Sequence, residues 1–397
     1  MTNSNSTPSK LLLPILSLAV LSTWLVTIIF QILLIDIAKY YQIQIGTASM
    51  AASVGSVSGI IFGLLMAVVS IRFNHKLLLL SGLVCTILGI LGYYFAPNFA
   101  SLLAANIGVG AGIAIVNAMS FSIIGDNYPL EKRGKAVGVI VAAMTFAFVV
   151  GSIAVGVIVS FGDWRLAVIL LALPFAIASL VLAAFVVPRR PILNVHVNKE
   201  PFSIGCKLAF SCLSTVAALL VTMFLLCESA ISYYSVSFFR DQFGLSATLG
   251  ASFNLIANVA SAVGGAVAGL MVNRVGRKKL GTITLVISSG LTIMFMFMPT
   301  LELSGFIGIL RFWFSSMAMT AGGSLILEQL PKFRSTMMSL NTVFMNLGMF
   351  VASLIGGFML NGYGYQALGL VLGSLGIVGT IVWITLVKEP VLQNKNN

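Results

Sequence analysis

The chain of 397 residues is 59% hydrophobic and only 8% charged, with a formal net charge of +12. In soluble domains about a quarter of all residues are charged, because their surface faces water. This composition therefore excludes an ordinary water-soluble protein and favours one whose surface faces lipid.

Apolar segments of about 20 residues, the length of a helix that crosses a bilayer, recur from one end of the chain to the other. They lie near 11–36, 47–70, 77–96, 99–124, 135–160, 165–187, 209–238, 247–272, 280–299, 303–327, 336–361 and 366–387. The first is too long for a signal peptide, so we interpret it as a membrane helix. Because helices satisfy their own backbone groups in lipid, the sequence predicts an all-α membrane protein with about twelve transmembrane helices.

The positive charges predict the orientation of these helices. With the N-terminus inside, only Lys39, Arg165, Arg240 and Arg311 fall outside the cytoplasmic segments. Positive residues concentrate in cytoplasmic loops, so we expect both termini on the cytoplasmic face of the cell membrane. The excess of Lys and Arg therefore indicates the orientation of the helices in the membrane. We expect a lipid bilayer as partner and no nucleic acid.

The most polar internal stretch, Pro188 to Lys207, divides the chain into two similar halves. It predicts an N-terminal six-helix bundle (1–188), a cytoplasmic linker (189–208) and a C-terminal six-helix bundle (209–397). Setting Arg133 on Arg334, in matching segments after the fourth and tenth spans, places Gly156 on Gly357 without a gap. Parallel internal repeats of this kind are typical of secondary transporters.

The loop between spans eight and nine reads Gly269-Leu-Met-Val-Asn-Arg-Val-Gly-Arg-Lys-Lys279. It resembles the Gly-x-x-x-Asp-Arg-x-Gly-Arg-Arg/Lys loop of the major facilitator superfamily, with Asn273 where Asp is usual. Ala67–Lys76 is a degenerate first-half copy of the same loop. The Pro129–Gly134 loop resembles the family's loop after helix four, and Asp163-Trp164-Arg165 resembles the Trp-Arg pair that opens helix six. The resemblance implies two pseudo-symmetric six-helix bundles that alternate access around a midplane site, and we expect a monomer.

By the same resemblance, residues of these loops hold and release the cytoplasmic ends of the bundles. The residues expected in gating are Gly269, Asn273, Arg274, Gly276, Arg277, Arg72, Arg133 and Arg334. Gly269 is expected to allow two helices to approach closely. The alternative, favoured for Lys278 and Lys279, is that these cations only anchor the topology.

The overall pattern is most similar to the drug-efflux branch, with two departures. Asn106 stands where proton antiporters of the branch carry Arg, and Gly151-Ser152 stands where they carry Gly-Pro. We expect export of a small organic solute. Uptake or uniport of a metabolite, such as an organic anion bound by Arg311, is the alternative.

Two ionisable side chains lie well inside predicted spans, away from the span ends, where charge is expensive and marks functional sites. Glu228, in span seven, is the one acid near the midplane. Burial disfavours a charged carboxyl, so we expect it to exchange protons or to contact the substrate. The alternative is a carboxyl held protonated between helices. Arg311, in span ten, requires an anionic or polar partner: Glu228, a bound anionic substrate, or the outer interface.

Polar residues repeat at helical spacing in the spans that line the cavity of the resembled family. The predicted substrate- and proton-binding residues are Glu228, Arg311, Asn106, Gln31, Trp24, Asn117, Ser232, Asn254 and Asn258. For any single one of them, helix packing is the competing explanation.

Two other classes of protein fit the sequence less well. A membrane-embedded enzyme needs clustered His, Asp or Glu at one face, but His75 and His196 lie in separate loops. The four cysteines lack metal or disulfide spacing, and no phosphate-binding loop or nucleophile elbow is found. A sensor would carry a sizeable soluble domain. We therefore expect a transporter, with no cofactor, no metal and no enzymatic activity.

Overall fold

The computed structural model describes residues 11–70, 72–128, 130–159, 163–188 and 202–389, and within these ranges it leaves the side chains at 67, 68, 130–134, 202, 273, 334 and 335 undescribed. Every regular element in the described ranges is helical, so the expected all-α architecture is confirmed. The chain folds into two compact units of nearly equal internal contact.

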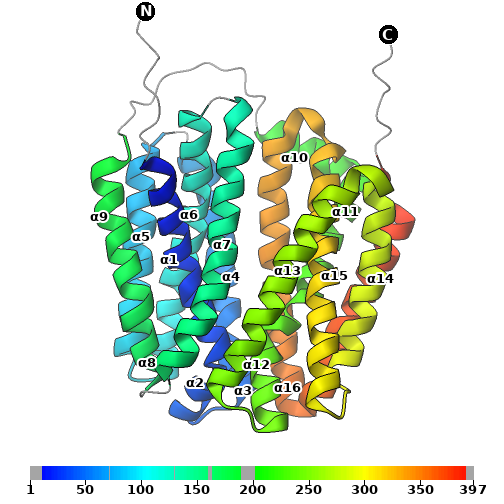
Figure 1. Ribbon diagram of the computed structural model, residues 1–397. Helices are drawn as coiled ribbons and strands as arrows, with labels where there is room; N and C mark the ends of the chain where they lie inside the picture. Colours follow the sequence, from blue (N-terminus) through cyan, green and yellow to red (C-terminus); the bar gives the residue numbers. More distant parts are fainter. Residues whose placement is uncertain (1–10, 71, 129, 160–162, 189–201, 390–397) are drawn as a thin grey trace, which may run out of the picture. The chain divides into compact units, whose positions relative to one another are not determined.

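Unit 1 comprises residues 1–44, 51–195 and 245–255. Its described helices, seen in Figure 1, are α1 (Leu12–Ile32), α2 (Leu34–Tyr40), α4 (Ala51–Val69), α5 (His75–Phe95), α6 (Phe99–Asn127), α7 (Leu130–Val159), α8 (Trp164–Ala167) and α9 (Leu173–Val186). Helix α1 packs against α6, α7 and α9. Leu16, Leu79, Val116 and Ile140 lie in the resulting apolar core.

Unit 2 comprises residues 45–50, 196–244 and 256–397. It contains α3 (Ile45–Ser49), α10 (Phe202–Ser211), α11 (Leu213–Ser229), α12 (Ile231–Phe243), most of α13 (Ala247–Val275), α14 (Arg277–Phe295), α15 (Leu301–Gln329) and α16 (Arg334–Leu386). Helix α11 packs along α16, and α14 packs along α15 and α16. Leu219, Leu285, Leu325 and Trp383 lie in their common apolar core.

Polar residues and glycines mark the points where the long helices begin or end. Asn74 and Asn98 cap α5 and α6 by accepting hydrogen bonds from backbone N–H groups of the first turn. Gly244 ends α12 in the left-handed region with φ 66°. A π turn (Val168–Ala172) precedes Pro174, whose missing N–H breaks the regular helical ladder.

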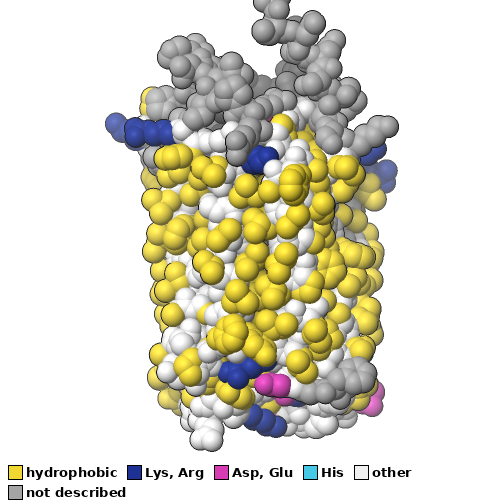
Figure 2. Space-filling model, turned by 90° about the vertical axis from the view of Figure 1, so that its left-hand side faces the viewer, with side chains coloured by type: hydrophobic (Ala, Val, Ile, Leu, Met, Phe, Trp, Pro, Cys, Tyr) yellow, Lys and Arg dark blue, Asp and Glu magenta, His cyan; other side chains and the backbone are white. Residues whose placement is uncertain are grey.

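Nine helical stretches of the described chain are long and apolar enough to cross a membrane. One of them, Thr336–Leu386, contains two helices that meet at Gly364. Together with α14 and α15, which are of similar length but more polar, these make up the twelve expected spans. On the face drawn in Figure 2, hydrophobic side chains cover the broad middle, and Lys and Arg gather near its two ends.

The predicted domain boundaries stay a prediction. Each unit also takes in a short piece from the other half of the sequence, 45–50 in unit 2 and 245–255 in unit 1. Of the predicted linker, residues 189–201 lie outside the described part of the chain, and Phe202–Ser211 form α10.

Candidate functional site

The most polar buried point of unit 2 is the carboxylate of Glu228, near the C-terminal end of α11 and 1% exposed. Oε1 accepts hydrogen bonds from Ser288 Oγ at 2.9 Å and from Thr292 Oγ1, and Oε2 accepts one from Ser315 Oγ at 3.5 Å. Hydrogen bonds donated to a carboxylate stabilise its charged form. The hydroxyls of α14 and α15 therefore partly replace the water that Glu228 loses on burial.

Arg311 of α15 supplies the opposite charge. Its guanidinium is completely buried, and Nη1 lies 3.7 Å from Oε1 of Glu228. Nη2 donates a hydrogen bond of 2.6 Å to Ser232 Oγ on α12. Glu228 and Arg311 are the two buried charged side chains in the described part of the protein, and they neutralise one another.

The pair is not fully satisfied by hydrogen bonds. Among the described residues, Nε and Nη1 of Arg311 have no hydrogen-bond partner, and neither has the nearby Ser289 hydroxyl. Buried donors of this kind normally find an acceptor. The N–H groups of these two nitrogens thus remain able to donate to an anionic or carbonyl oxygen.

Close packing positions the carboxylate. A Cβ added at Gly376 of α16 would lie 2.8 Å from Cγ of Glu228 and 2.6 Å from Ser289 Oγ. Only glycine fits at this contact, because a Cβ at residue 376 would overlap the side chains of Glu228 and Ser289. The chain also departs from a continuous helix here: α11 ends at Ser229 and α12 begins at Ile231, so Glu228 lies next to the break.

Of the predicted binding residues, the structure brings Glu228, Arg311 and Ser232 together. Asn258 lies in the unit 2 part of α13 and is half-buried. Ser288 and Thr292 were missed by the sequence reasoning. Their spacing of four residues, which continues that of Thr284, places a buried polar stripe on one face of α14 and was a usable signal.

In unit 1, Gln31 and Asn254 form a second polar cluster. Gln31 Nε2 donates to Asn254 Oδ1 at 3.4 Å, and Asn254 Nδ2 donates to Ser152 Oγ at 3.0 Å. All three side chains are buried. Ser152 is one of the two residues that replace the Gly-Pro pair of proton antiporters, and its hydroxyl here takes part in a neutral network.

The other three predicted residues of unit 1 do not join that cluster. Asn106 is buried against Gly55, and the Oδ1 atom of half-buried Asn117 has no recorded hydrogen-bond partner. Trp24 packs on Phe148, with ring centroids 5.7 Å apart. For Trp24 this contact favours the packing explanation over substrate stacking.

The loop that carries the family motif is built around Gly276 and Arg277. Gly276 has φ 92°, a conformation that L side chains rarely adopt. It turns the chain so that Arg277 begins α14, where its guanidinium pairs with Glu328 at the end of α15 and its backbone N–H donates to Glu389 Oε1 at 3.0 Å. The motif thus ties together the ends of three helices of unit 2.

Unit 1 contains a matching pair. His75 at the start of α5 lies 2.6 Å from Asp126 near the end of α6, the same positions that Arg277 and Glu328 take on α14 and α15. The two pairs are separated along the chain by equal numbers of residues. This equivalence supports the internal repeat, although the first copy of the motif is degenerate in sequence.

Of the remaining predicted gating residues, the structure describes the side chains of Arg72 and Arg274 and the surroundings of Gly269. Arg72 and Arg274 are exposed, and a Cβ at Gly269 would meet no atom within 4 Å, so the expected close helix approach at Gly269 is not made by the described residues. The side chains of Arg133, Asn273 and Arg334 lie outside those that the structure describes. The gating role of this group stays a prediction.

Comparison with known proteins identifies the family. The family model of the Major Facilitator Superfamily matches residues 15–315 and 306–397. Two curated relatives from Bacillus subtilis (strain 168), the uncharacterized MFS-type transporters YcnB and YwfA, are 33% identical over 113 residues and 30% identical over 121 residues. These alignments cover 28% and 30% of this chain, and the chain spans only 24% and 29% of the relatives' lengths.

Solved structures show the same fold at low sequence identity. A D-xylose–proton symporter superposes with a TM-score of 0.78 at 16% identity, covering 95% of this chain and 97% of that one. The nucleoside transporter NupG superposes with a TM-score of 0.76 at 14% identity, covering 95% and 100%. These relatives and structures are named as transporters, and none of them as an enzyme. The chain therefore belongs to the Major Facilitator Superfamily.

Proposed function

We propose that this protein is a secondary transporter that moves a small organic solute across the cytoplasmic membrane, with protons exchanged at Glu228. The observation that carries the proposal is the buried pair of Glu228 and Arg311, 3.7 Å apart. Burying a single carboxyl and a single guanidinium in a membrane protein costs free energy. Such side chains are retained where they bind substrate or protons.

The pair links protonation to a change in partners. If Glu228 takes up a proton, Arg311 keeps its charge but loses its counter-ion. A buried charge without a partner costs about 3–5 kcal/mol, so the protonated state favours any rearrangement or ligand that gives the guanidinium a new acceptor. This is the thermodynamic link that coupled transport needs, because each ligand shifts the state that the other prefers.

The membrane potential supplies part of the energy for such a step. One proton crossing 100 mV releases about 2.3 kcal/mol, less than the roughly 3–5 kcal/mol that an unpaired buried charge costs, so a new acceptor for Arg311 must supply the rest. Export as the direction rests on the similarity to the drug-efflux branch. Cytoplasmic termini are proposed from the concentration of Lys and Arg in the segments on that side, and a monomeric state from the family resemblance.

A thermal-shift screen with a panel of small organic solutes identifies a ligand, since a ligand that binds the folded protein raises its melting temperature. Proteoliposomes with an imposed pH gradient then measure uphill accumulation and solute exchange. We expect Glu228→Gln to abolish uphill accumulation and spare exchange. The control Glu302→Gln, an exposed acid at the start of α15, should leave both intact. Uphill accumulation by Glu228→Gln at the wild-type level would overturn the proposal.

Uptake or uniport of an organic anion is the second candidate. It is favoured by Nε and Nη1 of Arg311, two buried nitrogens without a hydrogen-bond partner among the described residues. Guanidinium N–H groups donate strong, charge-assisted hydrogen bonds to carboxylates. In the same screen this candidate predicts that carboxylate ligands stabilise the wild type and lose their effect in Arg311→Lys, which keeps the charge but not the planar guanidinium donors.

A further inference from the structure

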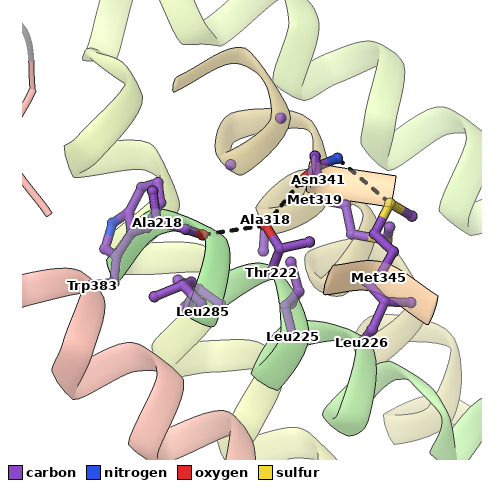
Figure 3. Close-up of a pocket in the computed structure, with 13 residues that line it drawn as sticks. Ala218, Thr222, Leu225, Leu226, Leu285, Ala318, Met319, Asn341, Met345 and Trp383 are labelled. Atoms are coloured by element: carbon purple, nitrogen blue, oxygen red, sulfur yellow. Dashed lines mark hydrogen bonds between the residues drawn. The ribbon is translucent and has the colours of Figure 1, made fainter. Parts of the chain in front are cut away.

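Unit 2 also contains a cavity whose lining does not include the ion pair. Its volume is about 200 Å³, and residues of α11, α14, α15 and α16 line it. Apolar side chains make up most of its wall, including Leu225, Leu285 and Trp383. Figure 3 shows Trp383 at one end of the cavity and Asn341 with Met345 at the other.

The volume restricts what can enter. An apolar protein cavity of about 150 Å³ is large enough to bind benzene and stays dry when empty, whereas sites for drug-sized ligands run from about 300 Å³ upward. A cavity of about 200 Å³ therefore accommodates one six-membered ring with a small substituent.

One end of the cavity is polar and has unused hydrogen-bonding capacity. Thr222 Oγ1 donates to Asn341 Oδ1 at 3.0 Å, and Asn341 Nδ2 contacts the thioether sulfur of Met345 at 3.5 Å. A thioether is a weak acceptor, and the amide carries two N–H donors. Asn341, which is 7% exposed, thus offers a donor to an oxygen on a bound ring.

The walls differ in how easily they move. The indole ring of Trp383 is fixed, because Nε1 donates to the carbonyl of Lys278 at 3.1 Å and the ring lies against Gly281. Met319 and Met345 line the cavity as well, and methionine side chains adapt to differently shaped ligands. On α15, Gly322 lines the cavity, and a Cβ there would meet no atom within 4 Å. The space is open at this glycine.

We propose that this cavity binds a small aromatic or apolar ring carrying one oxygen substituent, with the ring against Trp383 and the oxygen at Asn341. The site is formed entirely by unit 2 and does not include Glu228 or Arg311. Its test measures binding alone, so the proposal stands or fails independently of proton-coupled transport.

The probe is 4-bromophenol, whose bromine quenches tryptophan fluorescence on contact. Replacing Trp24, Trp164 and Trp313 with Phe leaves Trp383 as the single reporter in the full-length protein. We expect saturable quenching on top of the linear quenching caused by probe dissolved in detergent. Gly322→Leu fills the cavity and should remove the saturable part. Gly305→Leu, an open glycine of the same helix outside the cavity, makes the same change in helix propensity and should retain it.

The polar end is tested by comparing 4-bromophenol with bromobenzene. One neutral hydrogen bond contributes about 1 kcal/mol, so Asn341→Leu should weaken 4-bromophenol binding about fivefold and leave bromobenzene binding unchanged. If Asn341→Leu fails to fold, Asn341→Met removes the same N–H donors with an unbranched, adaptable side chain and should give the same selective loss. Linear quenching alone, equal quenching in Gly322→Leu and wild type, or equal loss of both probes would overturn the proposal.

Discussion

The energy of the buried ion pair gives the sharpest prediction. Nη1 of Arg311 lies 3.7 Å from Oε1 of Glu228, and both side chains are 1% exposed. At an effective dielectric constant of about 20, Coulomb's law gives an attraction of roughly 4.5 kcal/mol at that distance. Glu228→Gln keeps the size of the side chain and an oxygen that accepts from Ser288, but removes the charge. We expect it to lower the free energy of unfolding by about 3–5 kcal/mol, because Arg311 stays buried without a counter-ion.

A double-mutant cycle separates this electrostatic effect from a general loss of packing. Arg311→Met should be comparably destabilising, since it leaves the Glu228 charge unpaired. The double variant Glu228→Gln/Arg311→Met should regain most of the loss, because replacing both members of a buried pair is often neutral. Reversible unfolding of the purified protein in mixed micelles measures all four free energies. Additive losses, with a coupling below about 0.5 kcal/mol, would refute the reasoning.

Three further predictions concern the motif loop and the orientation of unit 2. Gly276→Ala should lower the free energy of unfolding by about 1–3 kcal/mol in the same assay, because alanine at φ 92° is strained. Arg277→Ala should cost about 1 kcal/mol, and adding Glu328→Gln should then cost nothing further, since their ion pair is already lost. In right-side-out and inverted vesicles of single-cysteine variants, a membrane-impermeant maleimide should modify exposed Cys212 only from the cytoplasmic side, and buried Cys227 from neither.

Much of the fold follows from the sequence because lipid restricts the choices. Long apolar segments can cross a bilayer only as helices, and all twelve expected segments are helical. The interruption of span seven at Ala230 was not predicted, because neither proline nor glycine marks it. The sequence predicts two spans, 336–361 and 366–387, within the last helical stretch. Gly364 provides the positive φ at which these two helices meet.

The candidate site was predicted only as far as charge makes residues conspicuous. Glu228 and Arg311 stand out because ionisable groups in apolar spans are rare, and their pairing was one of the stated alternatives. Ser288 and Thr292 do not stand out in the same way. Hydroxyls in membrane helices commonly bond their own backbone, as Thr284 does with the carbonyl of Leu280 at 2.8 Å. Only the packing of α14 against α11 distinguishes them.

The cavity of unit 2 was beyond sequence reasoning. Its open space lies beside Gly322, which has no side chain to occupy it. The space beside Gly376 on α16, in contrast, is occupied by the side chain of Glu228. Both glycines look alike in an apolar helix. Which of them faces a void depends on the neighbouring helices and not on local sequence.

The most direct test of proton exchange at Glu228 is the proton flux that accompanies solute movement. Proteoliposomes containing a pH-sensitive dye are given a gradient of a solute identified by the thermal-shift screen, with no imposed pH gradient. The account predicts that the wild type moves protons in step with solute and that Glu228→Gln moves solute by exchange with no proton flux. An equal proton flux per solute in wild type and Glu228→Gln would contradict it.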